Sequence, residues 1–329
     1  MPLRVLLICQ FHPELVRGGA QQVTYELFQE LCERSDIECF LLASLDETCP
    51  SLFKSGARIT GFDGRAHEYL FLSRDYDSWW HKLSDTLLIE SFIEFLRTMR
   101  PDVVHFHHFV AFGIDLLSVL RRVLPDCRIV ITFHEFMAIC AADGHMVRRA
   151  DHSLCDHASQ VRCHQCFPDR SPEDFMLRKM WFMRHLAQVD CFACPSQFMI
   201  GHYANWGIEC NKLFHVTNGQ RSYATAPLRA NVAGPRNRFG FFGQLNDNKG
   251  PHIVLRALDL LRANGMTDFR VELNGDNQRF ASPGVRVEIE QFLAAEQQRS
   301  PAERLVTFKG SNHVDQLRQR MTSTSCSSA

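Results

Sequence analysis

Apolar and polar positions along the chain alternate between short apolar runs and amphipathic segments. Residues Leu3–Phe11 form an almost continuous apolar run, which is typical of a parallel strand covered on both faces. The segment from about Ala20 to Arg34 then has the spacing of an amphipathic helix. The same criteria predict further strands at Ile37–Ser44, Ala57–Asp63, Asp102–His108, Arg128–Glu135 and Asp190–Ser196. Residues 64–90 are rich in aromatic residues but show neither the spacing of a strand nor that of a helix, and we interpret them as irregular. Strands that alternate with helices predict a parallel, doubly wound α/β sheet.

A small, polar and proline-bearing stretch divides this pattern in two. We interpret residues 223–237 as a linker, because the strand–helix alternation restarts after it. The sequence therefore predicts two Rossmann-like domains, at residues 1–222 and 238–321. Residues 322–329, which are mostly Ser and Thr, read as an aberrant tail. In the second domain the expected strands are residues 238–244, 269–276 and 304–310, and the expected helices are residues 249–263 and 286–298.

Composition narrows the classes of function. A chain of 329 residues suits two domains, and its formal net charge of -1 provides no concentrated basic face for nucleic acid. The first apolar run is too short to span a membrane, and no other run is long enough. We therefore expect a cytoplasmic protein without a nucleic-acid partner, with peripheral contact at the inner membrane face as an open alternative.

Glycines and one lysine stand where phosphate groups are commonly bound. Gly18 and Gly19 follow the first strand and open a helix, where backbone N–H groups favour an anion such as a diphosphate. A tight strand-to-helix turn explains the pair equally well. Lys249 stands at the expected start of a helix in the second domain, beside a strand end. Taken alone, Lys249 is better explained as a solvated surface lysine.

A cysteine- and histidine-rich loop is expected at residues 136–170. The chain has 13 cysteines, a raised count. In a cytoplasmic protein such thiols are more often free or metal-bound than paired in disulfides. Four of them have spacing that suits a structural zinc ion, and free thiols are the alternative. These four are Cys140, Cys155, Cys163 and Cys166.

The order of the motifs resembles family 4 glycosyltransferases of the GT-B fold. The matching stretches are "GGAQQVTYELFQEL", "PDVVHFHHF", "ITFHEFMAIC", "CPSQFMIGHYANWGI", "HVTNGQ" and "RFGFFGQLNDNKGPHIVLRAL". The resemblance implies two Rossmann-like domains that face a cleft. It also implies transfer of a sugar from a nucleotide diphosphate sugar, a UDP- or GDP-sugar, with retention and without a required metal cofactor. The acceptor would be a glycan or a lipid-linked glycan, in the synthesis of a cell-surface polysaccharide.

The resemblance also assigns roles to single residues. His134 matches the catalytic histidine that hydrogen-bonds the donor sugar, and Lys249 would hold the diphosphate. Gln244 stands where the family usually has an arginine, so one cation remains where two are common. The other positions expected to approach the donor are Gly18, Gly19, Gly275, Asp276 and Gly310.

The end of the chain departs from the family pattern. A family member is expected to continue after Arg320 with a strand and with a helix that carries two glutamates. We therefore expect the second domain to be truncated and incomplete, with little activity. A frameshift explains the tail, because codons read one base out of frame give an apolar run if every serine is TCN. The alternatives are a non-catalytic remnant, a nucleotide-sugar-binding protein, and an epimerase or phosphorylase of the same fold.

Overall fold

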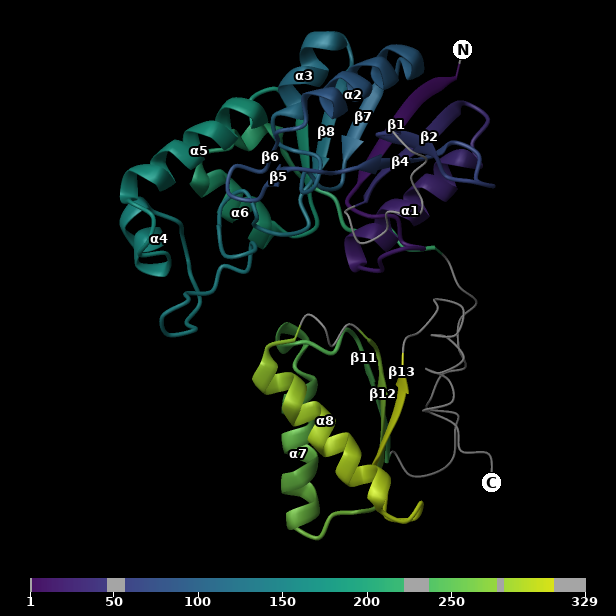
Figure 1. The fold of residues 1–329 in the computed structure, drawn as a ribbon, viewed down its shortest axis with the longest axis vertical. Helices are drawn as coiled ribbons and strands as arrows, with labels where there is room; N and C mark the ends of the chain where they lie inside the picture. Colours follow the sequence, from purple (N-terminus) through teal and green to yellow (C-terminus); the bar gives the residue numbers. More distant parts are fainter. Residues whose placement is uncertain (1, 46–56, 222–236, 277–280, 311–329) are drawn as a thin grey trace. The chain divides into compact units, whose positions relative to one another are not determined.

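The computed structural model describes residues 2–45, 57–221, 237–276 and 281–310. The chain divides into two compact units, Met1–Ser222 and Tyr223–Ala329, and each unit has a sheet and a core of its own (Figure 1). All of the predicted linker 223–237 except Asn237 lies outside the described residues. The predicted tail 322–329 and the expected end of the second domain, residues 311–321, also lie outside them.

An eight-stranded sheet organises the described part of the first unit, in the order β10-β9-β8-β7-β1-β2-β4-β3. Neighbouring strands are parallel except for the short β3, which pairs antiparallel with β4. The strands are β1 (Leu3–Cys9), β2 (Ile37–Leu45), β3 (Ile59–Gly61), β4 (Glu68–Leu72), β7 (Val103–Phe106), β8 (Arg128–Thr132), β9 (Cys191–Cys194) and β10 (Leu213–His215). A separate two-stranded hairpin is formed by β5 (Tyr76–Asp77) and β6 (Lys82–Leu83).

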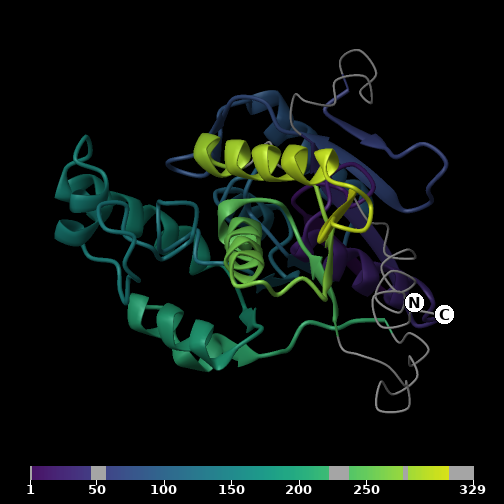
Figure 2. The ribbon, with the colours of Figure 1, turned by 90° about the horizontal axis from the view of Figure 1, so that it is seen from below.

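Helices cover both faces of this sheet. The helices are α1 (Gly19–Cys32), α2 (Thr86–Met99), α3 (Leu116–Val123), α4 (Gln160–Cys166), α5 (Pro172–Leu186) and α6 (Gln197–Trp206). On β1, Val5 and Leu7 pack in a cluster with Phe28 of α1. Leu6 and Ile8 point to the other face, into the core that includes α2 and α3. Both faces of β1 are therefore buried, which explains its continuous apolar run. Figure 2 shows α4 and α5, in teal, projecting away from the strands.

The interpretation of residues 64–90 as irregular is wrong. These residues contain β4, which pairs in parallel with β2 in the register Leu41↔Glu68 to Leu45↔Leu72. They also contain the β5–β6 hairpin. The predicted strand Ala57–Asp63 is in fact the three-residue edge strand β3. The apolar run of β4 is only a few residues long, and its strand conformation depends on pairing with β2.

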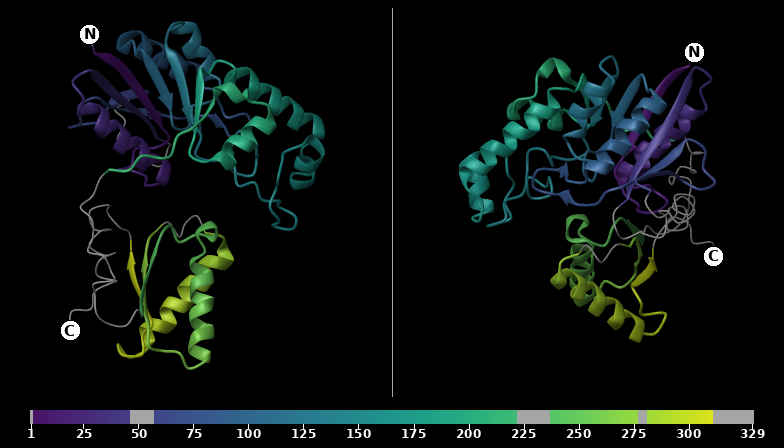
Figure 3. Two further views of the ribbon diagram at one scale, coloured as in Figure 1. Left: turned by 180° about the vertical axis from the view of Figure 1, so that it is seen from behind. Right: turned by 45° about the horizontal axis from the view of Figure 1, so that its top comes forward.

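The second unit has a three-stranded parallel sheet in the order β11-β12-β13 in its described part. Its helices α7 (Pro251–Ala263) and α8 (Pro283–Gln298) lie side by side on one face, as Figure 3 shows. Leu255, Leu273 and Ile289 are buried between these layers. The strands are β11 (Arg238–Phe242), β12 (Arg270–Asn274) and β13 (Val306–Gly310). No helix in the described part of either unit has the length and apolar character that a membrane crossing requires.

Candidate functional site

Three histidine rings gather where β7 and β8 end. His105 lies in β7, His107 directly follows β7, and His134 lies two residues beyond β8. The ring centroids of His105 and His107 are 4.3 Å apart, and those of His107 and His134 are 5.4 Å apart in a stacked arrangement. A hydrogen bond of 3.2 Å joins Nδ1 of His107 to Nε2 of His134. Because parallel strands end at the same edge, the sheet itself brings these rings together.

Burial keeps these imidazoles neutral. It lowers the pKa of His105 and of His134 to about 4, and it lowers the pKa of His107 well below its usual value. A neutral imidazole has one N–H donor and one bare nitrogen acceptor. The group can therefore exchange hydrogen bonds with sugar hydroxyls at neutral pH without adding positive charge.

Glu135 lies beside this group. Its Oε1 is 3.4 Å from Nε2 of His108, and its Oε2 accepts a hydrogen bond from the backbone N–H of Met137. Burial raises the pKa of Glu135 to about 7 and lowers that of His108 to about 3. The His108–Glu135 contact is therefore not a fixed ion pair at neutral pH, and the carboxyl group can hold or release a proton there.

A cavity of about 600 Å³ opens beside the histidines within the first unit. Its walls include His105 and His107, Thr132 of β8, and Glu26 and Glu30 of α1. Residues 216–221 close one side, and they are tied to α1 because Arg221 donates hydrogen bonds to Glu26 and Glu30 of that helix. This cavity therefore has polar groups on a largely apolar wall, as small-molecule sites commonly do.

The glycine pair of the first unit has no conformational reason to be glycine. Gly18 is the N-terminal cap of α1 with φ −163°, an extended conformation that any residue adopts. A Cβ on Gly18 would meet only the flexible end of the Gln21 side chain, and a Cβ on Gly19 would meet nothing within 4 Å. Close approach of a ligand thus remains an explanation for this pair, and it remains a prediction.

The strand ends of the second unit are joined by backbone hydrogen bonds. The N–H of Gly275 donates to the carbonyl of Gly310 at 2.9 Å, and the N–H of Gly243 donates to that of Asn274 at 3.0 Å. A Cβ on Gly275 would lie 1.7 Å from the Gly243 carbonyl oxygen, so only glycine fits there without a backbone shift. The structure therefore brings together the predicted donor-side residues Gly275, Asp276 and Gly310 at the carboxyl edge of this sheet.

Lys249 is placed differently from the prediction. It ends a 3-10 turn at Asp247–Lys249, and α7 starts only at Pro251, so the expected helix start at residue 249 is wrong. Its side chain is exposed, and none of the described residues forms an ion pair with it. Gln244 instead accepts a hydrogen bond of 2.9 Å from Nδ2 of Asn246. The lysine thus remains available to an anion, whereas the glutamine amide orients a neighbouring turn.

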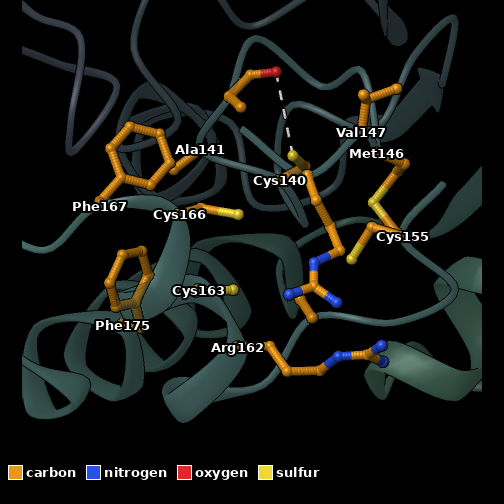
Figure 4. Close-up of a pocket in the computed structure, with 13 residues that line it drawn as sticks. Cys140, Ala141, Met146, Val147, Cys155, Arg162, Cys163, Cys166, Phe167 and Phe175 are labelled. Carbon is orange, nitrogen blue, oxygen red and sulfur yellow. Dashed lines mark hydrogen bonds between the residues drawn. The ribbon is translucent and has the colours of Figure 1, made fainter. Parts of the chain in front are cut away.

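The four cysteines of the predicted zinc loop line one small pocket (Figure 4). None of them is in a disulfide. As their side chains stand, the described residues include no group of three or more His, Cys, Asp or Glu arranged to hold a metal ion. The structure thus collects the four thiols around one pocket, and a metal there remains a prediction.

A match to known proteins now identifies the family. Residues 17–220, which include α1, the histidine group and the cysteine loop, match the sequence profile described as Glycosyltransferase Family 4. The chain belongs to this family. No curated protein matches the chain significantly.

Solved structures resemble this glycosyltransferase in fold. A crystal structure of Anabaena Alr3699/HepE in complex with UDP and glucose has a TM-score of 0.55 and 16% identity, and the match covers 94% of this chain and 70% of that one. The same protein in complex with UDP-glucose has a TM-score of 0.53 and 16% identity, with 94% and 70% covered. This likeness confirms the predicted fold class, GT-B with two Rossmann-like α/β domains.

Sequence reasoning missed His105 and His107 as members of the histidine group. Two histidines spaced i and i+2 at the end of a strand point to the same face, and "HFH" shows this spacing. The link to His134 was not visible, because it depends on the parallel pairing of β7 with β8.

Proposed function

We propose that this chain transfers a sugar from a UDP- or GDP-sugar to a glycan or lipid-linked acceptor, with retention at the anomeric carbon. We further propose that it acts in the cytoplasm, peripherally at the inner membrane face, in the synthesis of a cell-surface polysaccharide. The match of residues 17–220 to a glycosyltransferase family carries this proposal. His134 supports it, because a neutral, partly buried imidazole suits the hydroxyl groups of a donor sugar.

The donor diphosphate is assigned to the strand-end loops of the second unit. Lys249 supplies a cation that pairs with no described carboxylate, and Gly275 lets the neighbouring backbone approach closely. Gly18 and Gly19 are proposed to approach the donor from the first unit. The HepE complexes with UDP and UDP-glucose favour a uracil base over a guanine base.

The acceptor is assigned to the cavity beside the histidines. His107 belongs both to the cavity wall and to the hydrogen-bonded pair with His134. An acceptor in this cavity would therefore lie near the sugar that His134 binds. The carboxylates of Glu26 and Glu30 and the hydroxyl of Thr132 suit an acceptor with several hydroxyl groups.

Calorimetry with UDP- and GDP-sugars, followed by a transfer assay, tests the proposal. We expect binding of one nucleotide class, and we expect Lys249→Ala to weaken it about tenfold, because a charge-assisted phosphate contact contributes roughly 1.5 kcal/mol. Lys309→Ala is the control, since Lys309 lies in the same unit and pairs with Glu272 at 3.8 Å. Equal affinity of the wild type and Lys249→Ala would contradict the diphosphate assignment.

A nucleotide-sugar-binding protein without catalysis is the second candidate. Gln244 favours it, because an uncharged amide stands where the resemblance expects a second cation to stabilise the leaving diphosphate. Binding of a donor without turnover in the presence of glycan acceptors would favour this function over transfer.

A further inference from the structure

The pocket lined by the four cysteines is the feature in question, and it is small. Its volume is about 30 Å³, and its walls come from the segment after β8, from α4 and from Phe175 of α5. Pockets for organic ligands commonly begin at roughly 300 Å³, whereas one water needs only about 10–15 Å³. The pocket therefore suits a single small species, such as a metal ion.

The thiols surround this space from two parts of the chain. Cys140 and Cys155 come from the segment between β8 and α4, and Cys163 and Cys166 stand at i and i+3 on α4. Figure 4 shows their sulfur atoms around one hollow. Cys163 interacts electrostatically with each of the other three thiols. Cys155 also interacts with Cys140 and with Cys166. All four cysteines line the same small pocket, and this shared lining places them around one space.

The segment that carries two of these thiols has little secondary structure to hold it. Residues 133–159 contain no helix or strand, and their one isolated bridge pairs Val147 with Leu154. Hydrogen bonds from Arg178 to the carbonyls of Met137 and Ala138 fix its beginning. Segments of this length without secondary structure are uncommon in compact domains unless something else orders them. A cross-link between Cys140, Cys155 and α4 would order it.

The guanidinium group of Arg178 is a buried positive charge near the pocket, and negative charge nearby would stabilise it. The side chain of Arg178 is buried, and its hydrogen bonds to described residues go to carbonyl oxygens, those of Trp79, Met137 and Ala138. Arg178 does not line the pocket, but it lies near enough to Cys140 and Cys163 to interact with them electrostatically. No carboxylate of the described residues is within ion-pair distance of it. Four thiolates around a divalent cation carry a net charge of about −2, which this guanidinium would offset.

We propose that Cys140, Cys155, Cys163 and Cys166 bind one zinc ion as a structural centre that fastens residues 133–159 to α4. Four thiols release four protons to solvent, and four Zn–S bonds form without any change of oxidation state. Zinc is the divalent ion that best suits four thiolates in a tetrahedron. The sulfurs must turn inward about χ1 to reach it, because the present side-chain arrangement does not hold a metal. This proposal is independent of the sugar-transfer function.

Metal analysis of the full chain, purified with a reductant, loaded with zinc and freed of excess ion, tests the proposal. We expect about one zinc per chain, and with cobalt in its place we expect the intense visible bands of a tetrahedral tetrathiolate site. Cys163→Ser should lose most of the metal. Cys210→Ser should keep it, because Cys210 is an exposed free thiol outside the pocket.

Limited proteolysis gives a readout that needs no variant. Removal of zinc by a chelator should speed cleavage within residues 140–158, and added zinc should reverse this. If the loaded wild type holds well under one equivalent of metal, the proposal is overturned. The same holds if Cys163→Ser and Cys140→Ser keep the wild-type zinc content, or if zinc leaves the cleavage rate unchanged.

Discussion

At the scale of single residues, the hydrogen bond between His107 and His134 determines which nitrogen of His134 faces a ligand. Nε2 of His107 is buried and has no hydrogen-bond partner among the described residues. An unpaired buried N–H is rarer than an unpaired buried acceptor, so we infer that the proton of His107 is on Nδ1. His107 then donates to Nε2 of His134 at 3.2 Å, which leaves Nδ1–H of His134 free to donate to a sugar hydroxyl.

This arrangement predicts the effects of two substitutions at position 107. His107→Phe removes the donor, so His134 changes tautomer and transfer should fall about tenfold or more. His107→Asn keeps an N–H donor on the side chain and should retain most of the rate. His215→Asn, at an exposed position on β10, should have no effect. Nitrogen NMR of labelled histidine reads the His134 tautomer directly, and an unchanged tautomer in His107→Phe would contradict the inference even if activity fell.

His134→Ala removes the donor to the sugar itself. We expect transfer to fall about 100-fold, the usual effect of deleting one well-placed hydrogen-bond donor from an active site. Nucleotide affinity measured by calorimetry should stay within about twofold, because the diphosphate is assigned to the second unit. A parallel loss of nucleotide affinity would place His134 against the nucleotide rather than the sugar.

At the scale of elements, the sheet edge of the second unit depends on one glycine. In Gly275→Ala the new Cβ would meet the Gly243 carbonyl oxygen, which is backbone and cannot move aside cheaply. We expect a loss of about 2 kcal/mol in the free energy of unfolding, since the ends of β11 and β12 must separate. Gly284→Ala in α8 is the matched control, because nothing lies within 4 Å of its Cβ and alanine favours a helix. Urea unfolding measures both variants, and equal midpoints would show that the edge tolerates a side chain.

The elements also show which structure the sequence alone could predict. The continuous apolar run of β1 was enough to predict a buried strand, and the residues at the start of α5 were enough to predict a helix. There Ser171 and Asp174 form a capping box, and the S-x-x-D spacing of these two residues is visible in the sequence. In contrast, the apolar residues of α4 do not recur with the period of a helix, so α4 could not be predicted from their spacing. In the structure, Ser159 caps α4 and α5 packs beside it. The strand β4 was missed for the same reason, because its conformation depends on pairing with β2. Elements with a clear local pattern, such as an apolar run or a capping box, can thus be predicted from the sequence. The conformation of the other elements depends on contacts with residues far away in the sequence.

The histidine site follows the same division. His134 could be found from the motif "TFHE", whereas its partner His107 lies a strand away and meets it only in the folded sheet. Lys249 was identified as a cation beside a strand end, but its helix was expected to begin at residue 249, whereas α7 begins at Pro251. A site residue that belongs to a single sequence motif could be predicted. A contact between residues on two different strands could not.

At the scale of the whole molecule, the two units should respond differently to acid. Burial lowers the pKa of six histidines in the first unit, so the unfolded chain takes up protons below about pH 6.5 that the folded unit does not. Glu135 and Asp115 act in the opposite direction, because their pKa values are raised to about 7 and about 6. The six histidines are His81, His105, His107, His108, His134 and His185.

The histidines outnumber the two carboxyl groups, so the first unit should lose stability as the pH falls from about 7 to about 5. Each excess proton taken up by the unfolded chain costs about 1.4 kcal/mol per pH unit. In the described part of the second unit the shifted carboxyl groups, Asp247, Glu288 and Glu303, have lowered pKa values, and these matter only below about pH 4.5. Deuterium exchange read by mass spectrometry should therefore show faster exchange in β7 and β8 at the lower pH, after correction for intrinsic rates, with β12 unchanged. Equal acceleration in both units would mean that the buried histidines do not set the acid response.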